Sequence, residues 1–238
     1  MLKNLVTTKG AWDDGSVRLT MPGVVGVVLV IVALIVVAAL VRHHRVNTRE
    51  RVRLTTKQIV YSAVALALAI VCSMIKFANL PMGGSITLFS MLFIVLIGYW
   101  YGPYVGLMTG VAYGLLQFVM EPIFYTVPQM LLDYPLAFGA LGLAGFFYKK
   151  KHGLQIGYIV AVFGRYVFAC ISGVVFFYSY APEGMNPVVY SIGYNATYLV
   201  PEAVVTLVLV SLPPVAKALS YVKRQAVADE TVKKPVVL

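Results

Sequence analysis

The sequence is poor in charge and in cysteine. Of its 238 residues, 12% are Asp, Glu, Lys or Arg, whereas 60% are hydrophobic. This composition excludes an ordinary water-soluble domain, in which about a quarter of the residues are charged. The two cysteines, Cys72 and Cys170, both lie inside apolar runs and therefore give no indication of the redox compartment.

Motifs for several other functions are also missing. The chain has no G-x-x-x-x-G-K-[ST] motif, so any ATP-driven work requires another chain. His43 and His44 have no partners at metal-ligand spacing, and no metal or other cofactor is expected. The 19 basic residues cluster beside apolar runs and are not interleaved with aromatics, which argues against nucleic acid as a partner.

Long hydrophobic runs are abundant. Residues 21–41 carry no charge and are long enough to cross a bilayer once. Six further runs lie at about 58–75, 86–101, 104–120, 128–148, 156–180 and 188–212. The pattern predicts an all-α, polytopic membrane helical bundle, with a six-helix domain at 58–215 and one extra N-terminal transmembrane helix.

The basic residues also predict the orientation in the cell membrane. They cluster in the linker at 42–57, at 149–151 and in the tail at 216–238, and these three segments lie on one side of the predicted bundle. Because Lys and Arg beside spans stay preferentially in the cytoplasm, we expect a cytoplasmic C-terminus and an N-terminal segment, 1–20, outside.

Three charged residues lie inside the predicted spans. A charge at the bilayer centre costs about 2.5 to 3.5 kcal/mol on insertion scales, so Asp133, Arg165 and Glu202 are functional candidates. Asp133 is expected about 8 Å below the outer surface. Arg165 and Glu202 are each expected about 15 Å from the cytoplasmic side, which predicts either a structural ion pair or a part in transport. The different depths of Asp133 and Glu202 argue against an acid–base pair, and no enzyme activity is expected.

A polar stripe runs along the last predicted span. Spacings of four, three and four residues place its members on one face of a helix, which we expect to look into the bundle. The members are Ser191, Asn195, Tyr198 and Glu202. Asn195 has nearly the same expected depth as Asp133, so the two are predicted to line one cavity.

Aromatic side chains share the outer layer with these polar groups. Tyr134, Phe177 and Tyr190 lie at similar expected depth, although an interfacial aromatic belt explains most other aromatics there. Aromatic faces beside a carboxylate attract an organic cation. The sequence therefore predicts a small, flat, positively charged ligand that enters from outside.

Two pairs of small residues lie on the span at 58–75. Ala63 with Ala67, and Ala65 with Ala69, each allow close approach of another helix. The spacing leaves open whether that helix is internal or belongs to another subunit. Gly139, Gly142 and Gly145, three residues apart, also predict close helix packing.

Several ordered motifs carry a family resemblance over about residues 54–215. They are LPMGGSITLFSM at 80–91, LLDYPLAF at 131–138, GRY at 164–166, SGVVFF at 172–177 and YAPEGMNP at 180–187, followed by Tyr190 and Asn195. In these segments the chain resembles the thiamine-specific substrate-binding subunits (S components) of energy-coupling factor transporters, the YuaJ type.

The resemblance implies a six-helix subunit that captures thiamine outside and docks on a transmembrane coupling protein with two ATPases. It assigns the carboxylate facing the cation to Asp133, with Tyr134 beside it. The other implied substrate-binding residues are Tyr113, Phe177, Tyr190 and Asn195. Ala63 and Ala67 resemble the surface that contacts the coupling protein.

Two positions depart from the family pattern. Relatives commonly have His where this chain has Ala169, and Trp where it has Phe177. The function expected from the resemblance is high-affinity thiamine capture for uptake. The alternative is the same type of subunit for a pyrimidine or thiazole precursor.

Overall fold

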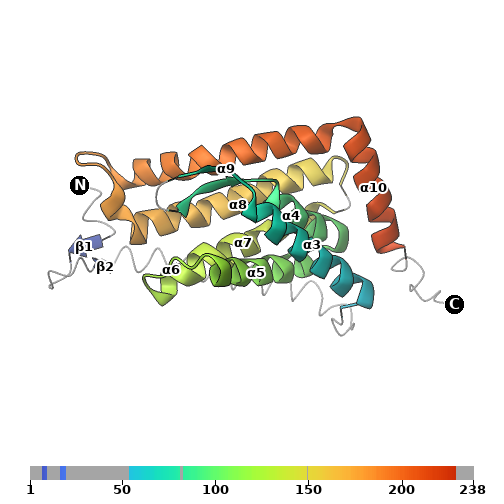
Figure 1. Cartoon of the computed structure of the whole chain (residues 1–238), viewed down its shortest axis with the longest axis horizontal. Helices are drawn as coiled ribbons and strands as arrows, with labels where there is room; N and C mark the ends of the chain where they lie inside the picture. Colours follow the sequence, from blue (N-terminus) through green and yellow to red (C-terminus); the bar gives the residue numbers. More distant parts are fainter. Residues whose placement is uncertain (1–6, 10–16, 20–53, 81–82, 149, 229–238) are drawn as a thin grey trace. The chain divides into compact units, whose positions relative to one another are not determined.

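The computed structural model describes residues 7–9, 17–19, 54–80, 83–148 and 150–228 (Figure 1). The predicted extra helix at 21–41 lies outside these residues. The chain divides into two units, which are described separately. The smaller contains Ala169–Tyr194 and the antiparallel strands β1 (Thr7–Lys9) and β2 (Val17–Leu19). The larger contains Leu54–Phe168 and Asn195–Leu238.

The larger unit is a bundle of apolar helices. Its elements are α3 (Thr56–Met74), β3 (Lys76–Asn79), β4 (Ser85–Thr87), α4 (Ser90–Tyr101), α5 (Pro103–Met120), α6 (Val127–Leu131), η2 (Leu132–Leu136), α7 (Ala137–Gly139), η3 (Ala140–Phe147) and α10 (Pro213–Val227). α8 (Gly153–Phe176) and α9 (Pro187–Ser211) each have residues in both units. Among the described residues, five helical spans are long and apolar enough to cross a membrane, and α4 is a shorter apolar helix. The predicted all-α membrane bundle is confirmed.

A capping box starts the first described span. The Thr55 hydroxyl accepts a hydrogen bond from the Gln58 backbone N–H at 3.2 Å, and the Gln58 side chain accepts one from the Thr55 N–H at 3.0 Å. This reciprocal pair satisfies two N–H groups that a helix start leaves without intrahelical partners. Thr55 and Gln58 therefore determine where α3 begins.

The second span is not helical over the predicted range of 86–101. Its first residues, Ile86 and Thr87, belong to β4, which pairs with β3 in an antiparallel hairpin, and the helix begins only at Ser90. Phe89, the residue before the helix, adopts a left-handed conformation with φ of 56°. At about 1.5 Å per residue, α4 is only about 18 Å long, against a hydrocarbon core of about 30 Å. Extended backbone is tolerated at such depth only where protein groups bind its N–H and C=O groups.

The span at 127–147 is a helix of mixed type. It starts as the α-helix α6, becomes the π-helix η2 and ends as the 3-10 helix η3. Pro135 lies inside η2, where the proline nitrogen has no hydrogen to donate to the helix ladder. The Ala137 N–H donates to the Leu132 carbonyl, five residues earlier, which is the π-helical pattern.

Glycines hold this span close to α5. A 3-10 helix has three residues per turn, so the three-residue spacing of Gly142 and Gly145 places both on one face of η3. A Cβ on Gly142 would collide with the backbone of Gly106 and Leu107, and one on Gly145 would collide with Pro103. The close helix packing predicted from the glycine spacing is observed here.

The segment predicted as a cytoplasmic tail begins with a helix. α10 begins at Pro213 and turns away from the end of α9 (Figure 1). The Tyr101 hydroxyl donates to the Ala226 carbonyl at 3.2 Å. The Lys223 ammonium donates to the Tyr148 carbonyl at 3.0 Å and lies 3.6 Å from the centre of the Tyr99 ring. These contacts dock α10 on the bundle.

Candidate substrate-binding site

Asp133 lies in the π-helical turn, where the helix departs from α geometry. π-Turns inside α-helices occur frequently at functional sites. The side chain is half-buried, and its Oδ2 atom accepts a hydrogen bond from Nε2 of Gln129 at 2.6 Å. The acid is therefore held by a protein donor at a half-buried position.

Gln129 is completely buried, with 0% of its surface exposed. Its Oε1 accepts from the Tyr125 N–H at 3.0 Å, and its Nε2 also donates to the Ile123 carbonyl at 3.1 Å. The Gln129 backbone N–H donates to the Thr126 hydroxyl at 3.3 Å. Sequence reasoning missed this residue, although its four-residue spacing from Asp133 places both side chains on one helix face.

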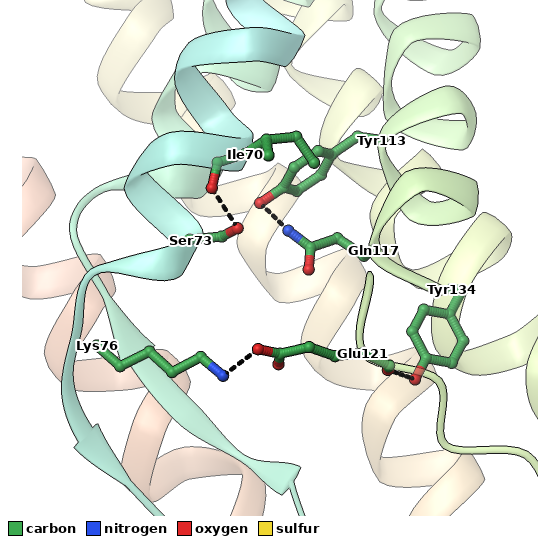
Figure 2. A network of polar contacts seen from close by, with 7 residues as sticks. All are labelled: Ile70, Ser73, Lys76, Tyr113, Gln117, Glu121 and Tyr134. Atoms are coloured by element: carbon green, nitrogen blue, oxygen red, sulfur yellow. Dashed lines mark hydrogen bonds and ion pairs between the residues drawn. The ribbon is translucent and has the colours of Figure 1, made fainter. Parts of the chain in front are cut away.

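Tyr134 uses its hydroxyl to organise the loop before α6. The hydroxyl donates to the Glu121 carbonyl at 2.8 Å and accepts from the Ile123 N–H at 2.8 Å, as Figure 2 shows for the first contact. Its ring packs edge-on against Phe118, with 5.1 Å between ring centres. In this structure Tyr134 is buried and holds the loop before α6, and its assigned contact with substrate stays a prediction.

An ion pair joins the hairpin to the end of α5. The Lys76 ammonium contacts the Glu121 carboxylate (Figure 2). Because the Glu121 carbonyl also binds Tyr134, this pair connects β3 to the loop beside Asp133. The pair is largely exposed and contributes about 0–1 kcal/mol to stability.

Tyr113 lies in the core, with 0% of its surface exposed. Its hydroxyl accepts from Nε2 of Gln117 at 2.6 Å and donates to the Ala69 carbonyl at 3.4 Å. The ring packs edge-on against Phe138 at 5.0 Å between centres. Tyr113 thus joins α3, α5 and α7, and its assigned role in substrate binding stays a prediction.

The polar stripe of α9 lies on the buried face of that helix, as predicted. Asn195 is 5% exposed, and its Oδ1 accepts from the Tyr198 hydroxyl at 2.6 Å. Glu202 and Thr206 continue the stripe, and the Thr206 hydroxyl donates to the Glu202 carbonyl at 2.7 Å. In the smaller unit, the Ser191 hydroxyl donates to the Cys170 carbonyl at 2.9 Å.

The sequence predicts an ion pair between Arg165 and Glu202, but in the structure each of them contacts a different residue. Oε2 of Glu202 accepts from the backbone N–H and the hydroxyl of Thr87, at 3.0 and 2.9 Å. The Arg165 guanidinium lies 4.2 Å from the centre of the Phe138 ring. In the part of the chain that the structure describes, no ion pair within 4.0 Å joins the two side chains.

Two of the predicted aromatic residues, Phe177 and Tyr190, lie in the smaller unit. Phe177 directly follows the end of α8 and stacks on Tyr180, with ring centres 5.9 Å apart. Tyr190, in the first turns of α9, stacks on Tyr194 at the same separation. The structure thus places Phe177 and Tyr190 in one unit, and Asp133 with the remaining predicted substrate-binding residues in the other.

The two alanine pairs of α3 have different surroundings. Ala65 and Ala69 are buried in the bundle, whereas Ala63 and Ala67 are exposed. The exposed pair lies among outward-facing aliphatic residues of the same helix, which are Ile59, Val60, Val64, Leu68 and Val71. Ala65 and Ala69 therefore face the interior of this chain's own bundle. The face of Ala63 and Ala67 is open to lipid or to another protein.

The chemistry of the described residues is that of a binding site. No group of three His, Cys, Asp or Glu side chains that fits a metal ion occurs among them. Instead, a positioned carboxylate lies in an apolar bundle that has several spans long enough to cross a bilayer. Together, fold and site define a multi-pass membrane protein of the kind that binds small molecules for transport.

Comparison with known proteins identifies the family. The sequence profile of the "Thiamine transporter protein" family matches residues 59–221, and the chain belongs to this family of transporters. A curated relative, "Thiamine transporter ThiT" of Bacillus subtilis strain 168, is 38% identical over 180 residues, which cover 70% of this chain and 92% of the relative. A second ThiT, from Lacticaseibacillus paracasei, is 32% identical over 120 residues, covering 43% and 60%.

A solved structure supports the fold. The structure of ThiT from Listeria monocytogenes superposes with a TM-score of 0.58 and is 22% identical, and the match covers 66% of this chain and 94% of the other. The family resemblance stated from the sequence motifs is confirmed by the family match. The protein is accordingly a multi-pass membrane transporter of the vitamin-uptake type.

Proposed function

We propose that this protein captures thiamine at the outer face of the membrane, as the substrate-binding subunit of an ATP-driven energy-coupling factor importer. Family membership supports the substrate class. The observation that carries the proposal is the half-buried Asp133, placed in a π-turn and held by Gln129. A carboxylate fixed in a bundle of apolar helices is suited to a cation such as the thiazolium of thiamine.

The family resemblance assigns further residues to the ligand, and our proposal includes them. Phe177 and Tyr190 supply ring faces, each contributing up to about 2 kcal/mol to a desolvated cation. Asn195 offers an amide for hydrogen bonds to the polar edge of the ligand. Tyr134 and Tyr113, which are both buried, complete the assigned set.

A thiamine precursor is the alternative substrate. Ala169 takes the place of a common family histidine and removes one hydrogen-bonding group, while Phe177 offers a smaller stacking surface than Trp. Both changes reduce the contacts available to a ligand with two linked rings. They favour either weaker thiamine binding or a smaller pyrimidine or thiazole compound.

Energy coupling is assigned to other chains. In this proposal the exposed face of Ala63 and Ala67 contacts the transmembrane coupling protein, which carries two ATPases. Small residues let two helix backbones approach closely in a membrane, and this exposed pair is available for such a contact. The C-terminus lies in the cytoplasm and the N-terminus outside.

Ligand titration of the purified protein tests the proposal. Thiamine and its pyrimidine and thiazole precursors are added separately, and quenching of the intrinsic aromatic fluorescence gives the Kd. Asp133→Asn removes the charge and costs about 1.5 to 3 kcal/mol, which weakens thiamine binding by about 10-fold to 150-fold. Glu121→Gln is the matched control, because that carboxylate already has Lys76 as its cation. Unchanged affinity in Asp133→Asn contradicts the assignment.

A further inference from the structure

We propose that Gln129 is the residue that positions the Asp133 carboxylate for a cationic ligand. This inference rests on the proposed function, since it concerns the same site. It starts from a contact that the family resemblance did not supply, the 2.6 Å hydrogen bond from Nε2 of Gln129 to Oδ2 of Asp133.

The orientation of the Gln129 amide is determined by its neighbours. Its Oε1 receives the Tyr125 N–H, and its Nε2 faces two acceptors, the Ile123 carbonyl and Asp133. A rotation of the amide by half a turn would put oxygen against oxygen at Ile123 and Asp133, and N–H against N–H at Tyr125. The buried amide therefore always presents a donor to the acid.

Burial makes this donor rigid. Gln129 has 0% of its surface exposed, so its side chain does not exchange these partners for water. Because Oδ2 of Asp133 is held by a fixed donor, rotation of the carboxylate about its Cβ–Cγ bond is restricted. A carboxylate that is oriented before the ligand arrives loses less conformational entropy on binding.

The absence of charge on the Gln129 side chain also matters for selectivity toward cations. Lys or Arg at this position would hold the acid more strongly, but would cancel the negative charge that a cation needs. An amide orients the carboxylate without adding a positive charge beside it. Gln129 thus acts as a positioning residue for a site selective for organic cations, while Asp133 makes the contact.

A double-mutant cycle on the full-length chain in detergent tests this role. Gln129→Met keeps the length of the side chain and removes the amide, and we expect it to raise the thiamine Kd about tenfold. In the Asp133→Asn background, the same change is expected to alter the Kd less than twofold, because the group that Gln129 positions is then already lost. Gln155→Met is the matched control, because it makes the same change in α8 at a residue that is not assigned to substrate binding.

The possible results separate this inference from the proposed function. If Asp133→Asn weakens binding but Gln129→Met retains full affinity, the positioning role is overturned and thiamine capture stands. An equal loss from Gln129→Met in both backgrounds shows a general structural effect and also overturns it. Absence of thiamine binding by the wild-type chain overturns both proposals. If Gln129→Met does not fold, Gln129→Asn replaces it, because the shorter side chain keeps an amide but draws it away from Asp133.

Discussion

Glu202 of α9 accepts two hydrogen bonds from Thr87 of β4, from its backbone N–H at 3.0 Å and from its hydroxyl at 2.9 Å. The two residues are 115 positions apart in the chain. Thr87 lies at the point where the second span changes from strand to helix, and its hydroxyl also contacts that of Ser90 at 2.7 Å. The buried carboxylate thus binds a backbone group that the missing helical turn leaves without a helix partner.

This contact gives Glu202 a structural role in closing the break of the second span. Glu202 is 4% exposed, and α4 has no capping hydrogen bond from the side chain of its own N-cap residue, Phe89. A carboxylate beside the N-terminus of a helix is also favoured by the helix dipole. The contact with Thr87 therefore stabilises the end of β4, just before the left-handed Phe89 and the short helix α4.

Replacement of Glu202 should destabilise the fold, and the loss should be larger when the new side chain has no acceptor for the Thr87 N–H. Glu202→Leu leaves the Thr87 N–H buried without an acceptor, which costs about 1 to 3 kcal/mol. Glu202→Gln retains an acceptor oxygen and should cost less. Thermal unfolding of the purified protein in detergent measures the difference, and equal unfolding temperatures for both variants would show that the Thr87 contact contributes little.

Variants of Glu202 also distinguish its contact with Thr87 from an ion pair with Arg165. If Glu202 acts on Thr87, neutral replacement of Arg165 and of Glu202 should have additive effects on stability. The ion pair predicted from depth gives the opposite expectation, that the double replacement harms folding less than either single one. Unfolding temperatures of Arg165→Gln, Glu202→Gln and the double variant decide between the two.

The glycine contact between η3 and α5 should not tolerate a methyl group. Gly142→Ala places a Cβ against the backbone of Gly106 and Leu107, which has no flexible end to move aside. We expect a marked loss of folded protein, measured by the monodisperse fraction in size-exclusion chromatography. Gly193→Ala is the control, because its Cβ meets nothing within 4 Å, and alanine favours a helix by about 1 kcal/mol over glycine. Comparable yields of the two variants would refute the close contact.

The docking of α10 on the bundle should depend on two side chains, Tyr101 of α4 and Lys223 of α10 itself. Tyr101→Phe removes the hydrogen bond to Ala226, and Lys223→Met removes the contacts with Tyr148 and Tyr99. Trypsin should then cleave faster after Lys217, which lies on the exposed face of α10.

Tyr221→Phe serves as the control for α10, because this side chain is mostly exposed and no described contact depends on its hydroxyl group. Its cleavage rate should equal that of the wild-type chain. Unchanged proteolysis in the Tyr101 and Lys223 variants as well would mean that the apolar face of α10 suffices for docking.

Substitutions in the two alanine pairs of α3 should differ in effect, one impairing energy coupling and the other impairing folding. Ala67→Trp adds a large side chain to an exposed position, so thiamine binding should persist while uptake by cells that carry the whole transporter falls. Ala69→Trp adds the same side chain at a fully buried position and should abolish both through misfolding. Binding and uptake that fall together in Ala67→Trp would contradict a separate coupling surface.

Much of the fold follows from hydropathy, because lipid demands long apolar segments. The predicted span at 58–75 agrees closely with α3, and the predicted span at 104–120 with α5. The extended segment at Ser85–Thr87 was missed because short apolar runs have the same hydropathy in a strand as in a helix. α10 was missed because only a few of its residues are strongly apolar and its docking partners are remote in sequence.

The candidate site was predictable in part, since an acid inside a membrane span is costly and therefore conspicuous. Asp133 was identified on this basis, and Gln129 was not, because a neutral amide carries no such penalty. The spacing of four residues between them was the available signal. For Tyr113, the family resemblance implies a ligand contact, which stays a prediction, and the structure adds that the hydroxyl belongs to a hydrogen-bond network within the core.

The sequence by itself determined that this chain is a multi-pass membrane bundle of the thiamine transporter family, because apolar length and local motifs are properties of contiguous residues. Only the tertiary structure decided which partners the buried polar groups have. Glu202 contacts Thr87, Arg165 stacks on Phe138, and Ala65 and Ala69 face inward while their neighbours face out. Such choices depend on which helices lie side by side, and a polar group in an apolar interior binds whichever partner the packing brings within reach.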